Sequence, residues 1–437
     1  MDMIVIGMIL VVCMLIMLTS GVWVALTLTG LSVIGLQLIG NESIGLLVGT
    51  SSWSATTGWS LTALPLFIWM GEILFRTRLS QDLFEGLSPM LSKIPGKLLH
   101  VNILSCGIFA AVSGSSAATA ATAATIGRMT LPELSKRGYS DEMAIGTLAG
   151  SGTLGLLIPP SIILIVYGVA AEVSIARLFL AGALPGLMLI SLFMLYTMTW
   201  SYFKGNNKGI VHDVSYTTKQ QFLALRKLIP ICILIGGVLG SIYQGVATPT
   251  EAAAFGVTGS LLLAMVLGGV SFADFIESIK GAIKNSCMLG FILVGAHFLT
   301  LAMGFIGIPN ELASWIDSLG LTPIQLIMCL TIFFVVLGCF LDGISVIVLT
   351  TSIVLPMVSQ AGIDLIWFGI FLVLVVEMSQ ITPPVGFNLF VIQALTGKNI
   401  LYVAKAAFPF FLMIGFGIVL ITAYPSIVLY LPTLMTQ

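Results

Sequence analysis

Residues 150–161 read GSGTLGLLIPPS, and residues 377–388 read EMSQITPPVGFN. Each stretch lies inside a long apolar run, Met143–Ala171 or Trp367–Leu395. Proline removes a backbone donor and disfavours helix at the residue before it, so an adjacent proline pair interrupts a helix. We therefore predict two broken helices, at about residues 141–172 and 363–396.

Two further apolar segments carry small or polar residues at their middles. Val101–Ala124 contains SGSS at residues 113–116, and Ile324–Val354 contains LDG at residues 341–343. Irregular backbone at membrane depth survives only where protein or a water-filled cavity covers it. We predict two re-entrant hairpins, at about residues 101–127 and 324–355, each with two half-helices that meet at a tip.

The composition requires lipid as the solvent for much of the surface. Of the 437 residues, 58% are hydrophobic and 8% are charged, whereas a soluble domain is about 25% charged. A nucleic-acid-binding protein, a secreted disulfide scaffold and a disordered chain are excluded. A membrane-spanning helix needs about 20 apolar residues. Eight unbroken runs fit this need, and with the two broken helices they predict ten crossings: Met3–Thr19, Val22–Ile39, Leu61–Phe75, Ala176–Phe203, Leu228–Tyr243, Thr250–Gly269, Ser286–Phe305 and Val403–Ala423.

The positions of the basic residues predict the orientation. With the N-terminus outside, residues 76–100, 125–140, 204–227, 271–284 and 396–405 become cytoplasmic. Of the 17 Lys and Arg residues, only Arg177 lies elsewhere. Cytoplasmic loops are enriched in Lys and Arg, so this distribution supports ten crossings and an N-terminus outside.

The chain contains an internal repeat at an offset of 224 residues. The offset pairs Gly71 with Gly295, Gly114 with Gly338, Pro132 with Pro356 and both Pro-Pro pairs, without gaps. In the charge-derived topology the two copies run in opposite directions across the membrane. Inverted repeats with broken helices are typical of secondary transporters. The fold prediction is an all-α polytopic membrane protein with two inverted repeats, each holding one hairpin and one broken helix.

The first hairpin tip and the first broken helix contain candidate ligand-binding residues. Hydroxyls and carbonyls at the tip could replace water around a hard cation, while a half-helix N-terminus could face an anion. Close packing of small residues is the alternative, and a proline kink satisfied by its neighbours is the alternative for the broken helix. The cation candidates are Ser113, Gly114, Ser115, Gly150 and Gly152, and the substrate candidates are Ser116, Thr119, Ser151 and Thr153.

The second tip and the second broken helix are more polar. Asp342 could ligate a cation, cap the following half-helix, or do both. Glu377 is an ionisable group near mid-membrane, where proton coupling or a structural hydrogen bond would explain it. The cation candidates here are Asp342, Gly343, Thr382 and Gly386, and the substrate candidates are Ser345 and Asn388.

Other polar residues have structural interpretations. Thr248-Pro249-Thr250-Glu251 has the form of a capping box, and Glu72 is expected to pair within the protein. The amphipathic segments Leu79–Lys93 and Phe272–Lys284 are predicted to be interfacial arm helices. The sequence has no nucleotide-binding, hydrolase or zinc-protease motif, so we expect neither an enzyme nor an organic cofactor.

Four motifs together resemble the large membrane subunit of tripartite ATP-independent periplasmic (TRAP) transporters. They are AVSGSSAAT at residues 111–119, GTLGLLIPPS at 152–161, ATPTEAAA at 247–254 and TPPVGFNLF at 382–390. The stretches at residues 64–72 and 178–186 fit as well, and the resemblance covers nearly the whole chain. Many relatives have proline where this chain has Ser352.

The resemblance implies sodium-driven uptake of a small organic acid by an elevator motion, in a bacterial inner membrane with the N-terminus periplasmic. It implies a periplasmic substrate-binding protein and a small four-span membrane subunit as partners, and no nucleic acid. It also implies one sodium ion near residues 113–115 and 150–153, and another near Asp342, Gly343, Thr382 and Gly386. C4-dicarboxylates, sialic acids and sugar acids all remain open as substrates.

The expected organisation follows from these assignments. Scaffold helices and an amphipathic segment occupy residues 1–60, the first repeat 61–200, a connector with scaffold helices and an arm 201–284, the second repeat 285–424, and a tail 425–437. Two other functions stay open: a carrier of similar architecture that needs no binding protein, and an anion channel.

Overall fold

The computed structural model describes residues 3–113, 116–204, 217–267 and 270–435, and the described residues are almost entirely helical. Between the two halves of the chain lies the short helix α11 (Thr218–Leu225). The first half contains α1 (Met3–Thr19), α2 (Val24–Leu38), α3 (Ile44–Thr57), the 3-10 helix η1 (Trp59–Thr62), α4 (Ala63–Phe75), α5 (Leu79–Leu91), α6 (Leu98–Ser113), α7 (Ser116–Lys136), α8 (Asp141–Gly152), the 3-10 helix η2 (Thr153–Leu156), α9 (Ile162–Ala170) and α10 (Ile175–Lys204).

The second half repeats this order at the predicted offset, to within a few residues. It contains α12 (Ile229–Tyr243), α13 (Pro249–Leu267), α14 (Phe272–Ile306), α15 (Ile308–Ser318), α16 (Pro323–Gly338), α17 (Gly343–Gln360), α18 (Leu365–Gln380), α19 (Phe387–Thr396), α20 (Ile400–Ala423) and α21 (Ser426–Leu434). Helices α1 and α2 correspond to α12 and α13, so the 224-residue repeat extends beyond residues 61–200 to the N-terminal helices.

The packing exchanges elements between the two halves. Helix α2 packs on α14, while its counterpart α13 packs on α4. The hairpin arm α7 packs on α19 of the other repeat, and α17 packs on α9. Such reciprocal pairs are what a two-fold axis between the repeats produces. The predicted repeat fold is therefore confirmed.

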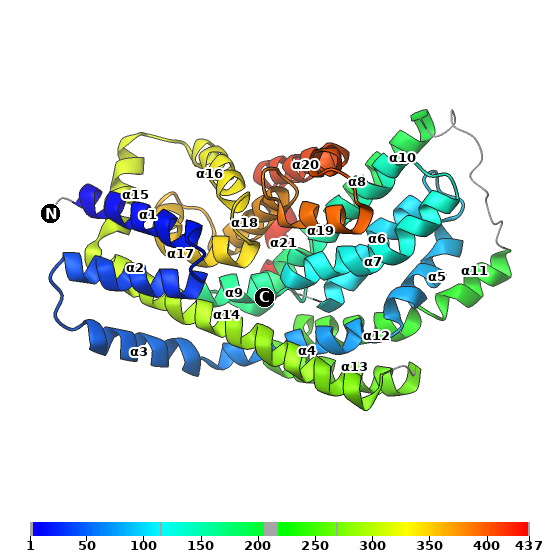
Figure 1. Ribbon diagram of the computed structural model, residues 1–437, viewed down its shortest axis with the longest axis horizontal. Helices are drawn as coiled ribbons and strands as arrows, with labels where there is room; N and C mark the ends of the chain where they lie inside the picture. Colours follow the sequence, from blue (N-terminus) through cyan, green and yellow to red (C-terminus); the bar gives the residue numbers. More distant parts are fainter. Residues whose placement is uncertain (1–2, 114–115, 205–216, 268–269, 436–437) are drawn as a thin grey trace.

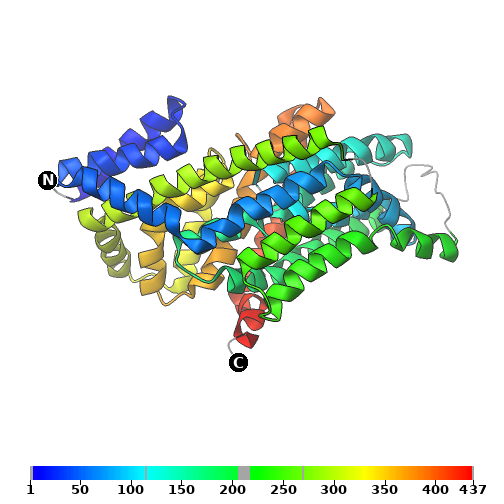
Figure 2. The ribbon, with the colours of Figure 1, turned by 90° about the horizontal axis from the view of Figure 1, so that it is seen from below.

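Two layers organise the molecule. Figure 2 shows α3 and α4 following each other along α14, and α2 on α14 and α13 on α4 complete this layer. The other layer holds the hairpins and the broken helices, with α18 in the middle of the molecule (Figure 1). Every residue of α18 from Ile366 to Gln380 is buried, as is α9 from Ile162 to Gly168. The first Pro-Pro break is buried with these helices, whereas Pro383 and Pro384 of the second break are exposed.

Helix length supports part of the predicted ten crossings. Five described helices are long and apolar enough to span a bilayer, namely α10, α13, α14, α17 and α20, and the bent pairs α3–α4 and α11–α12 raise the total to seven. Of the five, α17 lies in the predicted second hairpin, whereas the other four correspond to predicted crossings. Helices α1 and α2 are apolar but have 17 and 15 residues. The total of ten therefore stays a prediction.

One predicted boundary is wrong. The arm Phe272–Lys284 and the span Ser286–Phe305 form one continuous helix of 35 residues, α14. In the first repeat the corresponding segment bends by 58° between α3 and α4, where Gly58 is extended at φ −64°, ψ 120°. No residue within α14 has an extended backbone like that of Gly58. The amphipathic first turns of α14 therefore continue without a bend into its apolar, membrane-spanning turns.

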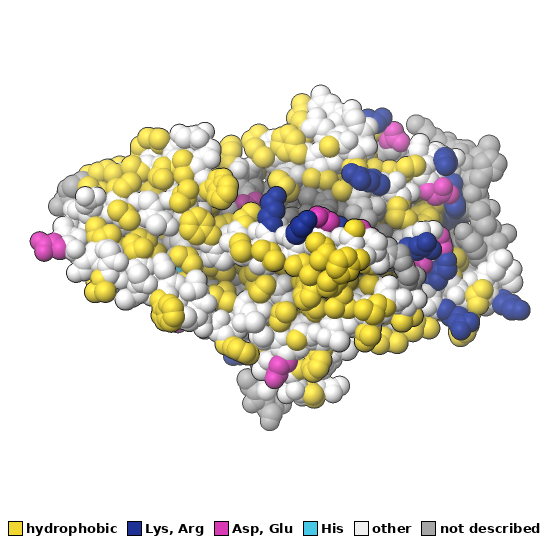
Figure 3. All heavy atoms as spheres, turned by 60° about the horizontal axis from the view of Figure 1, so that its bottom comes forward, with side chains coloured by type: hydrophobic (Ala, Val, Ile, Leu, Met, Phe, Trp, Pro, Cys, Tyr) yellow, Lys and Arg dark blue, Asp and Glu magenta, His cyan; other side chains and the backbone are white. Residues whose placement is uncertain are grey.

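Charged side chains are distributed unevenly over the surface. Figure 3 shows the Lys and Arg side chains gathered over the right half of that face, while hydrophobic side chains cover much of the rest. This asymmetry is what a positive-inside distribution predicts. The side on which the N-terminus lies stays a prediction.

Candidate functional site

The two broken helices cross in opposite directions. Near the first break, the Asn388 side-chain amide donates a hydrogen bond of 2.7 Å to the Ala149 carbonyl. At the far end, the Tyr167 hydroxyl donates a hydrogen bond of 2.6 Å to the Leu365 carbonyl. The start of α19 thus meets the end of α8, and the end of α9 meets the start of α18. The repeats are therefore inverted relative to each other, as predicted.

Thr153 and Glu377 occupy equivalent positions in the two repeats, 224 residues apart. The Thr153 side chain lies beside the Glu377 carboxyl, and both residues are fully buried. Equivalent positions meet only where the two-fold axis passes, so this pair marks the axis. It lies at the C-terminal ends of the two half-helices α8–η2 and α18.

The first break holds its hydroxyls close to the backbone. The Thr153 hydroxyl donates to the Gly150 carbonyl at 2.8 Å, and the Ser151 hydroxyl donates to the Thr147 carbonyl at 2.5 Å. Gly150 packs on Phe410, since a Cβ there would lie 2.6 Å from the Phe410 Cβ. Gly150 therefore faces α20 of the other repeat, while the Ser151 hydroxyl is held by its own helix.

Gly152 lies where three elements meet. A Cβ at Gly152 would lie 3.0 Å from the Asn388 amide nitrogen and 3.1 Å from the Ala123 Cβ on α7. Gly152, Thr153 and Asn388 are thus candidate residues that the fold does bring together, next to the arm that follows the first tip.

The second tip begins α17 with a side-chain cap. The Asp342 carboxylate accepts hydrogen bonds from the backbone N–H groups of Ile344 at 3.2 Å and Ser345 at 3.3 Å, and also from the Ser345 hydroxyl. The capping role considered for Asp342 is confirmed. Gly343 is enclosed, since a Cβ there would lie 2.7 Å from Val376 and 2.9 Å from Ile163. The tip therefore touches both broken helices.

The second break turns sharply at Gly386. Its φ of +42° is a left-handed conformation that favours glycine, and a Cβ there would lie 2.7 Å from the Thr382 carbonyl. The Thr382 hydroxyl donates to the Met378 carbonyl at 2.7 Å. This turn starts α19, whose first N–H groups have no side-chain cap.

The first tip is described only in part. Gly114 and Ser115 lie outside the described residues. Ser113 ends α6, while Ser116 and Thr119 lie in the first turns of α7. The predictions for these residues stay predictions.

Some contacts around the site were not predicted. Gly338, at the end of α16, packs on Ser379, since a Cβ at Gly338 would lie 2.6 Å from the Ser379 Cβ. The Asn102 amide on α6 donates to the Thr147 hydroxyl on α8 at 3.2 Å. The repeat pairing of Gly338 with Gly114 indicated that Gly338 matters. A single sequence does not indicate that Gly338 packs on Ser379.

Two structural predictions outside the site are confirmed. Thr248 and Glu251 form the capping box of α13, with the Thr248 N–H donating to Glu251 at 2.8 Å and the Glu251 N–H donating to Thr248 at 3.3 Å. Glu72 forms an ion pair with Arg76 at 3.5 Å, and it accepts a hydrogen bond from Asn285 at 3.3 Å.

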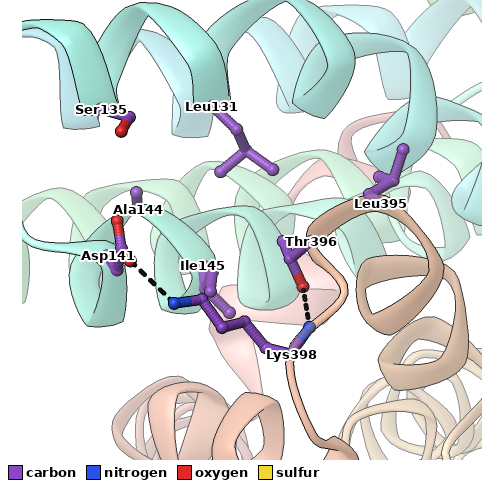
Figure 4. A pocket seen from close by; sticks show the side chains of 8 residues that line it. All are labelled: Leu131, Ser135, Asp141, Ala144, Ile145, Leu395, Thr396 and Lys398. Carbon is purple, nitrogen blue, oxygen red and sulfur yellow. Dashed lines mark hydrogen bonds and ion pairs between the residues drawn. The ribbon is translucent and has the colours of Figure 1, made fainter.

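A small pocket of about 180 Å³ lies between α7, the start of α8 and the end of α19. Figure 4 shows Lys398 across this pocket, with its ammonium 3.1 Å from the Asp141 carboxylate. Leu131, Ile145 and Leu395 form the apolar part of the lining. The pocket lies along the same three elements that meet at Gly152.

A family model described as tripartite ATP-independent periplasmic transporter, DctM component, matches residues 10–427. The chain belongs to this family. The motif-based resemblance is therefore confirmed, and this TRAP large permease is a transport protein and not an enzyme.

Curated relatives are similar over most of the chain. A C4-dicarboxylate TRAP transporter large permease of Pseudomonas aeruginosa is 32% identical over 86% of both chains. A sialic acid TRAP transporter large permease of Vibrio cholerae is 27% identical over 86% of both chains. These relatives are named for different substrates, so membership does not identify the substrate of this permease.

A solved structure shows the same fold. The YdaH transporter of Alcanivorax borkumensis superposes with a TM-score of 0.63 at 13% identity, covering 92% of this chain and 97% of that chain. The similarity supports the architecture of this TRAP large permease.

Proposed function

We propose that this TRAP large permease imports a small organic acid together with sodium ions, by an elevator motion in a bacterial inner membrane. The single observation that carries the proposal is the crossing of two broken helices at a fully buried centre, where the residue pair on the two-fold axis is polar. Such a centre gives ions and substrate one shared site between two inverted repeats.

Oxygen atoms suited to sodium are present at this centre. The Asn388 side chain donates through its nitrogen, which leaves its buried carbonyl oxygen without a hydrogen-bond partner among the described residues. The second tip adds the Asp342 carboxylate. Together with Gly152, Gly343, Thr382 and Gly386, these groups are the proposed surroundings of the transported sodium ions.

Helix N-termini favour an anionic substrate at the same centre. Neither α9 nor α19 has a side-chain cap at its N-terminus. At α9 the Ser161 hydroxyl donates to the Leu156 carbonyl instead, and at α19 the capping position is Gly386, which has no side chain. Their free N–H groups carry partial positive charge. At α17 the Asp342 carboxylate already fills that role, so we assign the substrate carboxylate to α19 rather than to α17.

The two layers suggest which parts move. We propose that the layer of α2 to α4, α13 and α14 stays fixed, while α6 to α10 and α16 to α21 carry the site across the membrane. The proposed partners are a periplasmic substrate-binding protein and a small membrane subunit. The N-terminus is proposed to be periplasmic, with 16 of the 17 basic residues on the cytoplasmic side.

Reconstitution into proteoliposomes tests the proposal. The large permease, the small subunit and the binding protein from the same operon are combined, and uptake of the binding protein's ligand is measured with an inward sodium gradient or with potassium in its place. We expect uptake only with sodium and with the binding protein.

The alternatives predict different results. Sodium-dependent uptake that persists without the binding protein would indicate a carrier of similar architecture. Flux that needs neither sodium nor the binding protein would indicate a channel. Either result would overturn the proposal.

A further inference from the structure

Glu377 is a buried acid whose charge no described residue balances. It has no exposed surface, and neither carboxyl oxygen has a hydrogen-bond partner among the described residues. Among the residues that the structure describes, Glu377 forms no ion pair, whereas Glu72, Glu85, Glu133 and Glu277 all do. An unpaired charge inside a membrane protein is costly and marks a functional group.

The neighbour of Glu377 supplies no proton to it. Thr153 lies beside the carboxyl, but its single hydroxyl hydrogen is donated to the Gly150 carbonyl. The Thr153 oxygen therefore presents only lone pairs on its other side. When the Glu377 carboxyl is ionised, two groups of acceptor oxygens face each other, and a cation between them would satisfy both.

The helix ends add to the demand for positive charge. Helix α8 with η2, and helix α18, both point their C-terminal ends toward this pair. Helix C-termini carry partial negative charge. A carboxylate at two such ends is stabilised by a cation, and half-helix C-termini are a known way to coordinate sodium in transporters.

A third acceptor oxygen contacts the residue before Thr153. The Asn388 carbonyl oxygen is buried and has no hydrogen-bond partner among the described residues, and it lies 3.5 Å from the position of a Cβ at Gly152. Carboxylate, hydroxyl and amide oxygens are hard ligands of the kind that sodium prefers, and one carboxylate balances one monovalent charge.

We propose that Glu377, Thr153 and the Asn388 carbonyl oxygen form a further sodium site on the two-fold axis, in addition to the ions at the two hairpin tips. This inference rests on the proposed sodium-coupled function. One of the positive charges moved in each transport cycle would then be the sodium ion bound at this site. The ion at this site joins the two broken helices directly.

Charge stoichiometry tests the site. In proteoliposomes with the complete three-component system, the membrane voltage that stops net uptake is measured over a series of sodium gradients and over a series of substrate gradients. The two slopes together give the number of sodium ions and the number of charges per substrate. We expect Glu377→Gln to lower both numbers by one while keeping substrate-specific uptake, because the amide keeps the shape and removes the charge.

Glu72→Gln is the matched control. It makes the same change at an acid that is paired with Arg76 and Asn285 in the fixed layer, and we expect wild-type stoichiometry. If Glu377→Gln does not reach the membrane, Thr153→Val removes one ligand oxygen with little change in shape. That variant is expected to raise the sodium concentration for half-maximal uptake.

Gln380 provides a rival explanation. It lies one turn after Glu377 on α18, and its side-chain nitrogen also has no hydrogen-bond partner within the described part of the chain. A hydrogen bond between the two side chains would satisfy both without an ion. Under that explanation Gln380→Leu and Glu377→Gln have similar effects and leave the sodium stoichiometry unchanged, which would overturn the site.

The other outcomes are also decisive. Loss of one charge with an unchanged number of sodium ions would assign the charge to a proton and reject the sodium site. A wild-type protein without sodium dependence would reject both the site and the proposed function. Wild-type coupling with unchanged stoichiometry in Glu377→Gln would reject the site alone.

Discussion

At the residue scale, Asp342 caps α17 and is proposed to bind sodium, and one substitution can separate the two roles. Its carboxylate caps α17, and asparagine caps a helix about as well as aspartate. We expect Asp342→Asn to keep the thermal stability of the purified protein and to raise the sodium concentration for half-maximal uptake roughly tenfold, equivalent to about 1.4 kcal/mol. Sodium titration of uptake and a melting curve measure the two effects.

Asp342→Ala is the companion variant. It removes the cap as well as the charge, so we expect an additional loss of about 1 kcal/mol in stability. A sodium titration of Asp342→Asn that matches wild type would restrict Asp342 to capping.

Gly338 is the second residue with a specific steric requirement. Because a Cβ there would overlap Ser379, we expect Gly338→Ala to lower stability by about 1–3 kcal/mol and to lower uptake. Adding Ser379→Gly removes the obstructing side chain and should restore part of the loss. Thermal melting of the single and double variants measures the coupling.

Gly290→Ala serves as the control for Gly338→Ala. It lies in α14 of the same repeat, and a Cβ there would meet no atom within 4 Å. If Gly290→Ala and Gly338→Ala behave alike, the contact with Ser379 is not the cause.

At the scale of elements, α5 and α11 are joined by an ion pair that depends on pH. The Lys227 ammonium, which follows α11, donates to Glu85 on α5, and the Gln81 amide donates to Glu85 at 2.8 Å. These two donors lower the pKa of Glu85 below its ordinary value, and the same pairing raises the pKa of Lys227. Gln221 adds a hydrogen bond to the Pro89 carbonyl at 3.0 Å.

The direction of both shifts defines the pH window of this contact. Because the pKa of Glu85 is lower in the folded protein, its stabilisation is present above the unfolded value and is lost as the pH falls through the folded value. The Lys227 contribution is lost at the other end, as the pH rises through its raised pKa.

We expect Glu85→Gln to speed hydrogen exchange of α11 at pH 7 by roughly two- to fivefold, since exposed pairs contribute under about 1 kcal/mol. At a pH below the lowered pKa of Glu85, where its carboxylate is protonated in the folded protein, the difference from wild type should disappear. Exchange measured by mass spectrometry at both pH values checks this. A difference that persists at the lower pH would mean that another contact holds α11.

The elements that the sequence predicted well have local causes. Each Pro-Pro pair breaks its own helix, the prolines at 249 and 323 begin helices, and Asp342 caps its own half-helix. These features depend on residues a few positions apart, so a single sequence contains them.

Other features depend on residues far apart in the chain and were missed. Nothing local to Gly150 indicates that it packs on Phe410, and nothing local to Gly338 indicates Ser379. The continuity of α14 was missed because an amphipathic segment followed by an apolar one resembles two helices. Of the candidate site, the position at the breaks was predictable, whereas the meeting of Thr153 with Glu377 required the three-dimensional arrangement.

At the scale of the whole molecule, the elevator proposal predicts which contacts must change. The rings of Phe75 on α4 and Phe109 on α6 lie 4.9 Å apart across the boundary between the proposed fixed and moving layers. The rings of Phe193 on α10 and Phe410 on α20 lie 5.3 Å apart within the moving layer. Cysteines are introduced as a pair at positions 75 and 109, or at positions 193 and 410, and each pair is joined by a short thiol cross-linker. Comparing the two pairs distinguishes motion between the two layers from motion within the moving layer.

We expect cross-linking of the 75/109 pair to lower uptake by roughly tenfold or more, because the barrier to moving the layer then includes a covalent bond. The 193/410 pair should keep most of its uptake after cross-linking. The six native cysteines are replaced first, since all six are free thiols. Equal uptake by both cross-linked pairs would contradict an elevator motion along this boundary.

The meeting of Thr153 with Glu377 limits how a chain of this kind could have evolved. A half-length ancestor that dimerised with an inverted copy of itself would place the same residue twice on the axis. Two glutamates would repel each other in the buried centre, and two threonines would provide no charge. A single carboxylate on the axis requires two different residues there. A dimer of identical half-length chains could not provide it, whereas two repeats of different sequence within one chain do.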